Sequence, residues 1–402
     1  MKEKNSNKKA LLALAVGGFG IGLTEFVIMG ILPNVAEALQ ITIPEAGHFI
    51  SAYALGVVVG APLLTSISHK LSSNKMLLFL MLWFTVFNTL SAFSTGYGMM
   101  LVMRFLSALP HGAFFGIGAV VAGKLAKEGK SAQAIAVMFT GLTVANIIGV
   151  PIGTYIGNQY HWSASFIMVG IVGILAMISI FYWMPHFKHE NDSSSEEEAK
   201  GLKNPEMWAL ILLTTIGTGG FFAWYSYIAP LLTNVSHLSE DMVSYAMILA
   251  GLGMFVGNFV GAKMTETFSP LRSVAISMFA IVLVLICNAL VASNAVMALI
   301  FTFIVGMIAF TISTPIQMAI INSAKGSEML GSSMNQSAFN MGNALGAYLA
   351  GLPIAYGFSA ASSSFVGAGL ALAGGIIAVT ILIYRKQKVK AKNKSSVSYC
   401  SS

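Results

Sequence analysis

The sequence predicts an all-α membrane protein built from two similar six-helix halves. Three observations lead to this fold class: the apolar composition, the placement of the basic residues and an internal repeat. Only 9% of the 402 residues are charged and 56% are hydrophobic, whereas a soluble domain is about a quarter charged. The composition therefore excludes a soluble enzyme.

Twelve apolar segments are long enough to cross a bilayer as helices. We expect them at residues 10–32, 45–68, 76–94, 98–122, 133–157, 163–184, 207–232, 240–262, 273–292, 295–320, 330–355 and 361–384. The basic stretch KEKNSNKK before the first segment resembles the start of a signal peptide. Because the apolar run is too long and no A-x-A site follows it, we expect the segment to be retained as the first helix.

The Lys and Arg residues predict the topology. If the spans alternate from a cytoplasmic N-terminus, all 22 except Arg104 fall on the cytoplasmic side, as the positive-inside rule requires. We therefore expect a multi-pass protein of the plasma membrane (the bacterial inner membrane) with both termini in the cytoplasm. The net charge of +7 then reflects topology and anionic lipid headgroups, and no nucleic-acid partner is expected.

The second half of the sequence repeats the first at a constant offset of 197 residues. Gly22 aligns with Gly219, and LGVVVG (55–60) aligns with LGMFVG (252–257). Parallel repeats of this kind place the binding site between the halves, near the membrane midplane. The expected boundaries are 1–187 for the first half, 188–205 for a polar cytoplasmic linker, 206–384 for the second half and 385–402 for a basic cytoplasmic tail.

Three ionisable side chains are expected deep within the spans: Glu25, Arg104 and His111. Such groups are costly in hydrocarbon, so each is a functional hypothesis. Gly18 and Gly22 share a helix face with Glu25 and form a Gly-x-x-x-Gly packing stripe, which turns Glu25 into the bundle. Arg104 lies at a similar depth and can pair with Glu25. A separable pair would let Glu25 carry a proton; the alternative is a static ion pair that locks two helices.

His111 lies two turns beyond Arg104 on the same helix face. It is either a proton relay or substrate ligand, or an imidazole hydrogen-bonded for packing. At the repeat position of Glu25 the second half has Phe222. The candidates for contacting a neutral substrate there are aromatic and amide side chains, each of which could instead serve packing: Trp224, Tyr225, Gln317 and Asn340.

Four segments together resemble a known family: GLTEFVIMGILP (22–33), ISAYALGVVVGAP (50–62), RFLSALPHGAFFGIGA (104–119) and TVANIIGVPIGTYIG (143–157). They are similar to the AraJ-like branch of the major facilitator superfamily, which contains 12-span drug:proton and sugar:proton antiporters. The resemblance covers about residues 10–384 and implies the major-facilitator fold, with export driven by the inward proton gradient. It implies proton transfer for Arg104 and the role of a span-1 acid for Glu25.

The resemblance also implies gating residues. In span 5, the antiporter motif would form a kinked, glycine-faced helix that lets the halves pack and seal; its residues are Gly141, Gly149, Pro151 and Gly153. The loop between spans 2 and 3 departs from the family pattern, with His69 at the usual Asp position. The equivalent loop of the second half keeps Glu266 and Arg272, so we expect that half to contribute most to the inner gate.

The expected function is proton-coupled efflux of small polar molecules by alternating access, with sugars or sugar-like compounds favoured. The expected partners are the substrate, protons and the lipid bilayer, and the protein is expected to act as a monomer. Since no Ser-His-Asp set, metal-ligand cluster or phosphate loop accompanies His111, we expect no enzymatic activity, metal or cofactor. The alternatives are a multidrug exporter of lipophilic compounds, a purine or nucleoside exporter, an uncoupled facilitator or importer, a channel and a membrane sensor.

Overall fold

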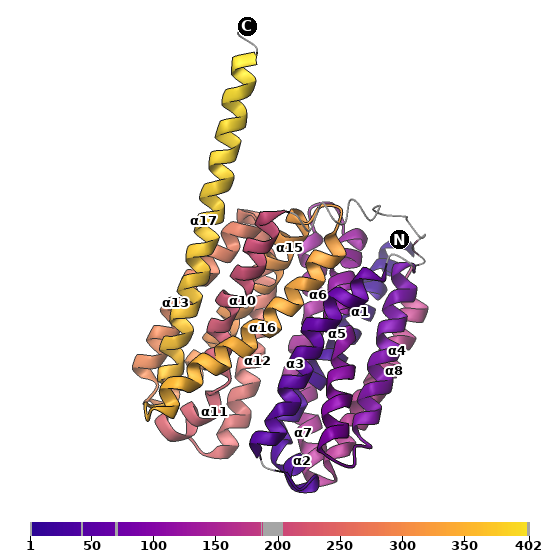
Figure 1. The fold of residues 1–402 in the computed structure, drawn as a ribbon, viewed down its shortest axis with the longest axis vertical. Coiled ribbons are helices and arrows are strands. Elements are labelled where there is room, and N and C mark those ends of the chain that lie inside the picture. Colours follow the sequence, from indigo (N-terminus) through magenta and orange to yellow (C-terminus); the bar gives the residue numbers. More distant parts are fainter. Residues whose placement is uncertain (1, 42, 69–70, 186, 188–203, 400–402) are drawn as a thin grey trace.

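The computed structural model describes residues 2–41, 43–68, 71–185, 187 and 204–399, and these form two helical bundles side by side (Figure 1). The first bundle contains α1 (Lys2–Gly30), α2 (Leu32–Ala38), α3 (Ile43–Ser66), α4 (Ser73–Ser91), α5 (Tyr97–Leu125), α6 (Ser131–Val144), the π-helical turn η2 (Ala145–Gly149), α7 (Val150–Gln159) and α8 (Trp162–Trp183). The second contains α10 (Pro205–Tyr225), α11 (Ile228–Pro230), the π-helical turn η3 (Leu231–Val235), α12 (Glu240–Phe268), α13 (Pro270–Val291), α14 (Ala295–Phe310), α15 (Ser313–Ser323), α16 (Glu328–Ala355) and α17 (Ser362–Tyr399).

All twelve expected spans fall on helices, and the predicted all-α fold is confirmed. Ten helical segments of the described chain are long and apolar enough to cross a membrane by themselves. The two other long helices are α4 and α16, which carry polar residues such as Asn88 and Asn335. Both side chains are buried, so the polarity of these helices faces the bundle. Most of the expected linker lies outside the described residues.

The repeat in the sequence is also a repeat in the helices. From α3, starting at Ile43, to α12, starting at Glu240, the separation is 197 residues. It is also 197 from α6, starting at Ser131, to α16, starting at Glu328. Each long span in one bundle therefore has its counterpart in the other.

The repeated glycine motif has the same packing role in both halves. Gly60 of α3 lies against the backbone of Leu109 in α5, and Gly257 of α12 lies against the backbone of Met307 in α14. A side chain at either glycine would collide with the neighbouring backbone, so only glycine allows these helix pairs to approach so closely.

Several spans are interrupted rather than straight. The first breaks after α1 and continues as α2, and the repeat-related span breaks after α10 at the equivalent place. Span 5 passes through the π-helical turn η2, a wider winding that commonly marks functional sites in helices. The last helix, α17, continues past the bundle and projects from the side on which α1 begins (Figure 1). We call this the termini side.

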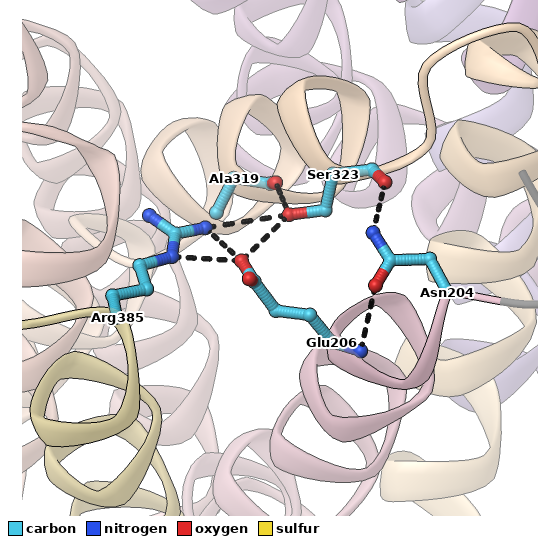
Figure 2. A network of polar contacts seen from close by, with 5 residues as sticks. All are labelled: Asn204, Glu206, Ala319, Ser323 and Arg385. Atoms are coloured by element: carbon cyan, nitrogen blue, oxygen red, sulfur yellow. Dashed lines mark hydrogen bonds and ion pairs between the residues drawn. The ribbon is translucent and has the colours of Figure 1, made fainter. Parts of the chain in front are cut away.

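A polar cluster ties three helices together on the termini side of the second half (Figure 2). Glu206, at the start of α10, accepts hydrogen bonds from Arg385 of α17 (Nε to Oε1, 2.7 Å) and from Ser323 at the end of α15 (3.1 Å). Asn204 caps α10 and donates to the Ser323 carbonyl oxygen at 2.6 Å. The cluster thus fixes the helix ends within one bundle.

Candidate functional site: a cavity between the two halves

A cavity lies between the two bundles, with about 600 Å³ of empty space when the adjoining open solvent is included. It is lined by Glu25, Phe26, His111, Phe139, Leu142, Phe221, Phe222, Tyr225, Met254, Phe310, Ser313, Gln336, Phe339 and Asn340. Half of these residues are Phe or Tyr, and the only acid among them is Glu25. The wall is therefore largely aromatic, with a few polar groups.

Glu25 is turned into the cavity by the packing of α1. Gly18 lies against the carbonyl of Met138 and Gly22 against Leu142, both on α6. This close contact places the next part of the same α1 face, Glu25, at the boundary between the halves, where its side chain is 9% exposed. The carboxylate forms no hydrogen bond or ion pair with any other described residue.

Arg104 is fully buried on α5 behind this wall. Its Nη1 donates to Thr24 Oγ1 at 2.9 Å, and Thr24 in turn donates to Asn88 Oδ1 at 2.5 Å. The Nε and Nη2 atoms have no hydrogen-bond partner in the described structure. Arg104 interacts electrostatically with Glu25 without a direct ion pair. The predicted ion pair is therefore not formed between these two described residues.

His111 lines the cavity and is held by a residue that the sequence analysis did not select. The Tyr53 hydroxyl of α3 lies 3.2 Å from His111 Nδ1. The Tyr53 ring also faces Arg104, whose Cζ is 4.4 Å from the ring centroid. A signal for Tyr53 exists in the sequence, because Gly56 and Gly60 follow it by three and seven residues and so share its helix face.

Only some of the second-half candidates reach the cavity. Tyr225 and Asn340 line it, together with Gln336. Trp224 is fully buried in the core of the second half. Gln317 is fully buried as well; its Oε1 accepts from Asn335 Nδ2 at 2.5 Å and its Nε2 donates to Ser332. Trp224 and Gln317 therefore support the wall from behind.

Direct contacts between the halves gather toward the termini side. Lys130, just before α6, forms an ion pair with Glu266 of α12 (Nζ to Oε2, 3.0 Å), and Gln133 donates to the same oxygen at 3.1 Å. Asn258 of α12 donates to the Ala136 carbonyl at 2.7 Å. Arg272 is exposed at the start of α13 and pairs with no described residue.

A second set of contacts joins α3 to α16. Thr65 donates to Ser333 Oγ at 2.6 Å, and Ser337 donates to the Val58 carbonyl at 3.3 Å. The residues belong to the end of α3 and the beginning of α16, so this set also lies toward the termini side. Together with the Lys130–Glu266 pair, it joins the two halves on that side. His69, the departure from the family loop, lies outside the described residues.

The glycines of the span-5 motif pack within the first half, not between the halves as the sequence analysis expected. Gly141 lies against the backbone of Ala15, and Gly149 and Gly153 lie against Phe19 and Val27, all on α1. Pro151 lies in the first turn of α7, directly after the π-helical turn η2 that interrupts span 5. The contact with the second half falls elsewhere on this span.

The turn η2, which ends at Gly149, adds a contact with the second half to those that Gln133 and Ala136 of α6 make. Asn146 and Ile147 of η2 lie beside Gly251 of α12. Residues on one turn of a helix point in different directions. The wider winding of the π-helical turn therefore changes which residues of span 5 face the second half.

Two repeated bundles with a cavity between them are an architecture typical of membrane transporters. Residues 14–335 match the family model described as Major Facilitator Superfamily, and the chain belongs to that family. Its members are transporters and not enzymes. The predicted fold family is confirmed.

Relatives in the curated collection are similar over nearly the whole chain. AraJ of Escherichia coli (strain K12) is 39% identical over 381 residues, covering 95% of this chain and 96% of AraJ. The inner membrane transport protein YdhP of the same strain is 39% identical over 369 residues, covering 90% and 94%. The resemblance to the AraJ-like branch is thereby confirmed. In fold, the chain is similar to the transporter FucP in its outward conformation, with a TM-score of 0.75 at 14% identity, covering 94% of this chain and 99% of FucP.

Proposed function

We propose that the protein is a proton-coupled exporter of small molecules and that Glu25 carries the proton. The observation that carries this proposal is the separation of Glu25 from Arg104. The carboxylate lines the cavity, while Arg104 keeps two buried nitrogens without partners. A static pair would satisfy these donors, because a buried guanidinium is costly without a partner. A carboxylate that can turn between the cavity and Arg104 has the two states that proton exchange requires.

The transport cycle follows from the direction in which the cavity is closed. In this proposal the positive-inside rule assigns the termini side to the cytoplasm, so the Lys130–Glu266 contact belongs to an inner gate and the cavity faces outward. In this state Glu25 takes a proton from outside. The halves then rock, the inner gate opens, and Glu25 releases the proton inward as substrate enters. The loaded carrier returns and releases the substrate outside.

The cavity wall favours substrates that combine an apolar or aromatic part with hydrogen-bonding groups. The rings of Phe139, Phe222 and Phe310 offer stacking surfaces. Asn340 donates to the Gln336 carbonyl at 3.1 Å, which leaves its side-chain oxygen available to a ligand. Among the classes considered from the sequence, this combination favours lipophilic compounds or nucleobase derivatives.

Sugars or sugar-like compounds are the second candidate class. The observation in their favour is the uncharged polar group on the second-half wall, formed by Tyr225, Ser313, Gln336 and Asn340. These side chains suit a neutral substrate with several hydroxyl groups. A substrate screen on purified protein in liposomes, read by proton flux, separates the two classes.

The proton-coupling role is tested in liposomes with an imposed pH gradient. We expect Glu25→Gln to abolish uphill movement of a substrate found in the screen while substrate exchange continues, because exchange needs no net proton transfer. The control is Glu328→Gln, which changes an acid on the termini side outside the cavity. Uphill transport that survives in Glu25→Gln would show that another group carries the proton.

A further inference from the structure

Tyr53 joins two site residues that lie two turns apart on α5. Its hydroxyl is 3.2 Å from His111 Nδ1, and its ring centroid is 4.4 Å from Arg104 Cζ. The side chain is 2% exposed. One residue of α3 therefore contacts both the buried cation and the imidazole of the cavity wall.

The ring of Tyr53 compensates the charge of Arg104 in an unusual way. A buried cation needs a compensating partner, yet Arg104 has only the hydrogen bond to Thr24. The face of an aromatic ring attracts a guanidinium, most strongly where water is excluded. This attraction occupies none of the N–H donors. Arg104 is thus held in place while Nε and Nη2 stay free for a carboxylate, which can accept two parallel hydrogen bonds from a guanidinium.

The hydroxyl of Tyr53 has a separate role. It fixes one side of the His111 imidazole, and Phe115 contacts the ring with a centroid distance of 5.4 Å. The imidazole is therefore held at one orientation in the cavity wall beside Glu25. The hydroxyl contact and the ring contact can be removed independently by substitution.

The titratable groups around this position come from four helices. Glu25 belongs to α1, Tyr53 to α3, Arg104 and His111 to α5, and Tyr225 to α10, and Glu25 interacts electrostatically with Arg104, Tyr53 and Tyr225. The other helices packed here contribute neutral residues: Asn88 from α4, Phe139 and Leu142 from α6, and Phe166 from α8, whose ring centroid lies 5.7 Å from Arg104 Cζ. A change in the proton affinity of Glu25 can therefore be assigned to a small set of neighbours.

We propose that Tyr53 is a positioning residue for the proton site, whose ring holds Arg104 ready to receive the Glu25 carboxylate and whose hydroxyl holds His111 in the cavity wall. The inference rests on the proposed function of Glu25 as the proton carrier. It assigns the two roles to different atoms of one side chain, so two substitutions separate them.

The test compares Tyr53→Phe, which keeps the ring, with Tyr53→Leu, which removes it. The proton titration of Glu25 is followed in purified protein by the infrared carboxyl band that is lost in Glu25→Gln. In Tyr53→Leu the ionised carboxylate loses its held partner, so the titration midpoint should move by about one pH unit toward alkaline pH. In Tyr53→Phe the midpoint should stay near that of the unsubstituted protein, while substrate affinity falls by about fivefold as the His111 hydrogen bond is lost.

Tyr97 provides a matched control. It lies on α5, its hydroxyl is 2.8 Å from His48 Nδ1 of α3, and in the described structure no arginine lies over its ring. Tyr97→Phe and Tyr97→Leu should leave both the titration and the substrate affinity unchanged. If Tyr53→Leu does not give monodisperse protein, Tyr53→Met takes its place as an unbranched non-aromatic residue.

Two results would overturn the positioning role: an unchanged Glu25 titration in Tyr53→Leu, or equal shifts in the Phe and Leu variants. The transport assay distinguishes this failure from failure of the proposed function. If the unsubstituted protein shows no proton-driven transport but Tyr53→Leu still shifts the Glu25 titration, the proposed function is wrong and the positioning role of Tyr53 stands.

Discussion

Removal of the Glu266 carboxylate should open the termini side of the cavity. Glu266→Ala loses the ion pair with Lys130 and the hydrogen bond from Gln133. The Lys130 side chain is 46% exposed and that of Glu266 is 13% exposed, so the ion pair contributes about 0.2–1 kcal/mol. The hydrogen bond adds about 1 kcal/mol. A loss of about 1–2 kcal/mol shifts an equilibrium between two conformations by about 5–30-fold.

Spin labels on either side of this contact measure the shift. Glu128→Cys and Thr267→Cys place labels at exposed positions of the two halves, after Cys287 and Cys400 have been replaced by serine. Double electron–electron resonance should show a second, longer distance that grows in Glu266→Ala. Glu328→Ala, which removes an acid on the same side, should leave the distribution unchanged. An unaltered distribution in Glu266→Ala would refute the assignment of this pair to the gate.

Two further sets of substitutions test a helix-packing contact and a polar contact. In Gly60→Leu the new side chain collides with the backbone of Leu109 and should destabilise the protein by about 1–3 kcal/mol. In the control Gly98→Leu the space around the residue is open, so stability should not change. Equal melting temperatures of the two variants would contradict the packing role of Gly60. Glu206→Gln and Arg385→Gln should each lower the melting temperature slightly, because each breaks the ion pair between the two residues. The double variant should be no less stable than either single variant, since the same contact is lost. Additive losses would show that the two residues act separately.

The sequence is informative about the helices because a membrane span is a local property. Each segment must satisfy its own backbone hydrogen bonds, so length and apolarity specify a helix without knowledge of its neighbours. The glycine motifs around Gly60 and Gly257 also indicate which helix faces pack. The sequence predicts even the polar helix α16, because the residues around its amide side chains are long and apolar enough as a segment to form a span.

The contacts of Glu25 and Arg104 could not be predicted to the same extent. Their similar depth follows from counting residues along two helices, but their direction depends on how each helix is rotated. Successive residues on a helix point about 100° apart, and the neighbour of Glu25, Thr24, is the residue that contacts Arg104. Trp224 and Tyr225 differ for the same reason: one is buried in the core and the other lines the cavity.

Other site residues depend on contacts between helices that are distant in the sequence. The glycines of α3 indicate the packing face on which Tyr53 lies, but no property of α3 alone shows that Tyr53 contacts both Arg104 and His111. The sequence predicts that the Gln317 amide contacts a neutral substrate. In the structure, however, Asn335 and Ser332 of the second half already hydrogen-bond to this amide. Buried polar groups normally have such partners, and the sequence does not tell which amide has found one.

The two halves share one framework but differ in chemistry, and the difference lies at equivalent positions. Glu25 and Phe222 align in the repeat and line the same cavity, so symmetry places an acid on one wall and an aromatic ring on the other. The ion pair of the proposed gate shows the reverse arrangement, with the acid Glu266 on the second half and its partner Lys130 on the first. Rocking of two bundles requires similar frames, whereas coupling to a proton requires a site that only one half supplies. The repeat therefore fits the proposed rocking of the two halves, and the departure from symmetry at Glu25 fits the proposed coupling to protons.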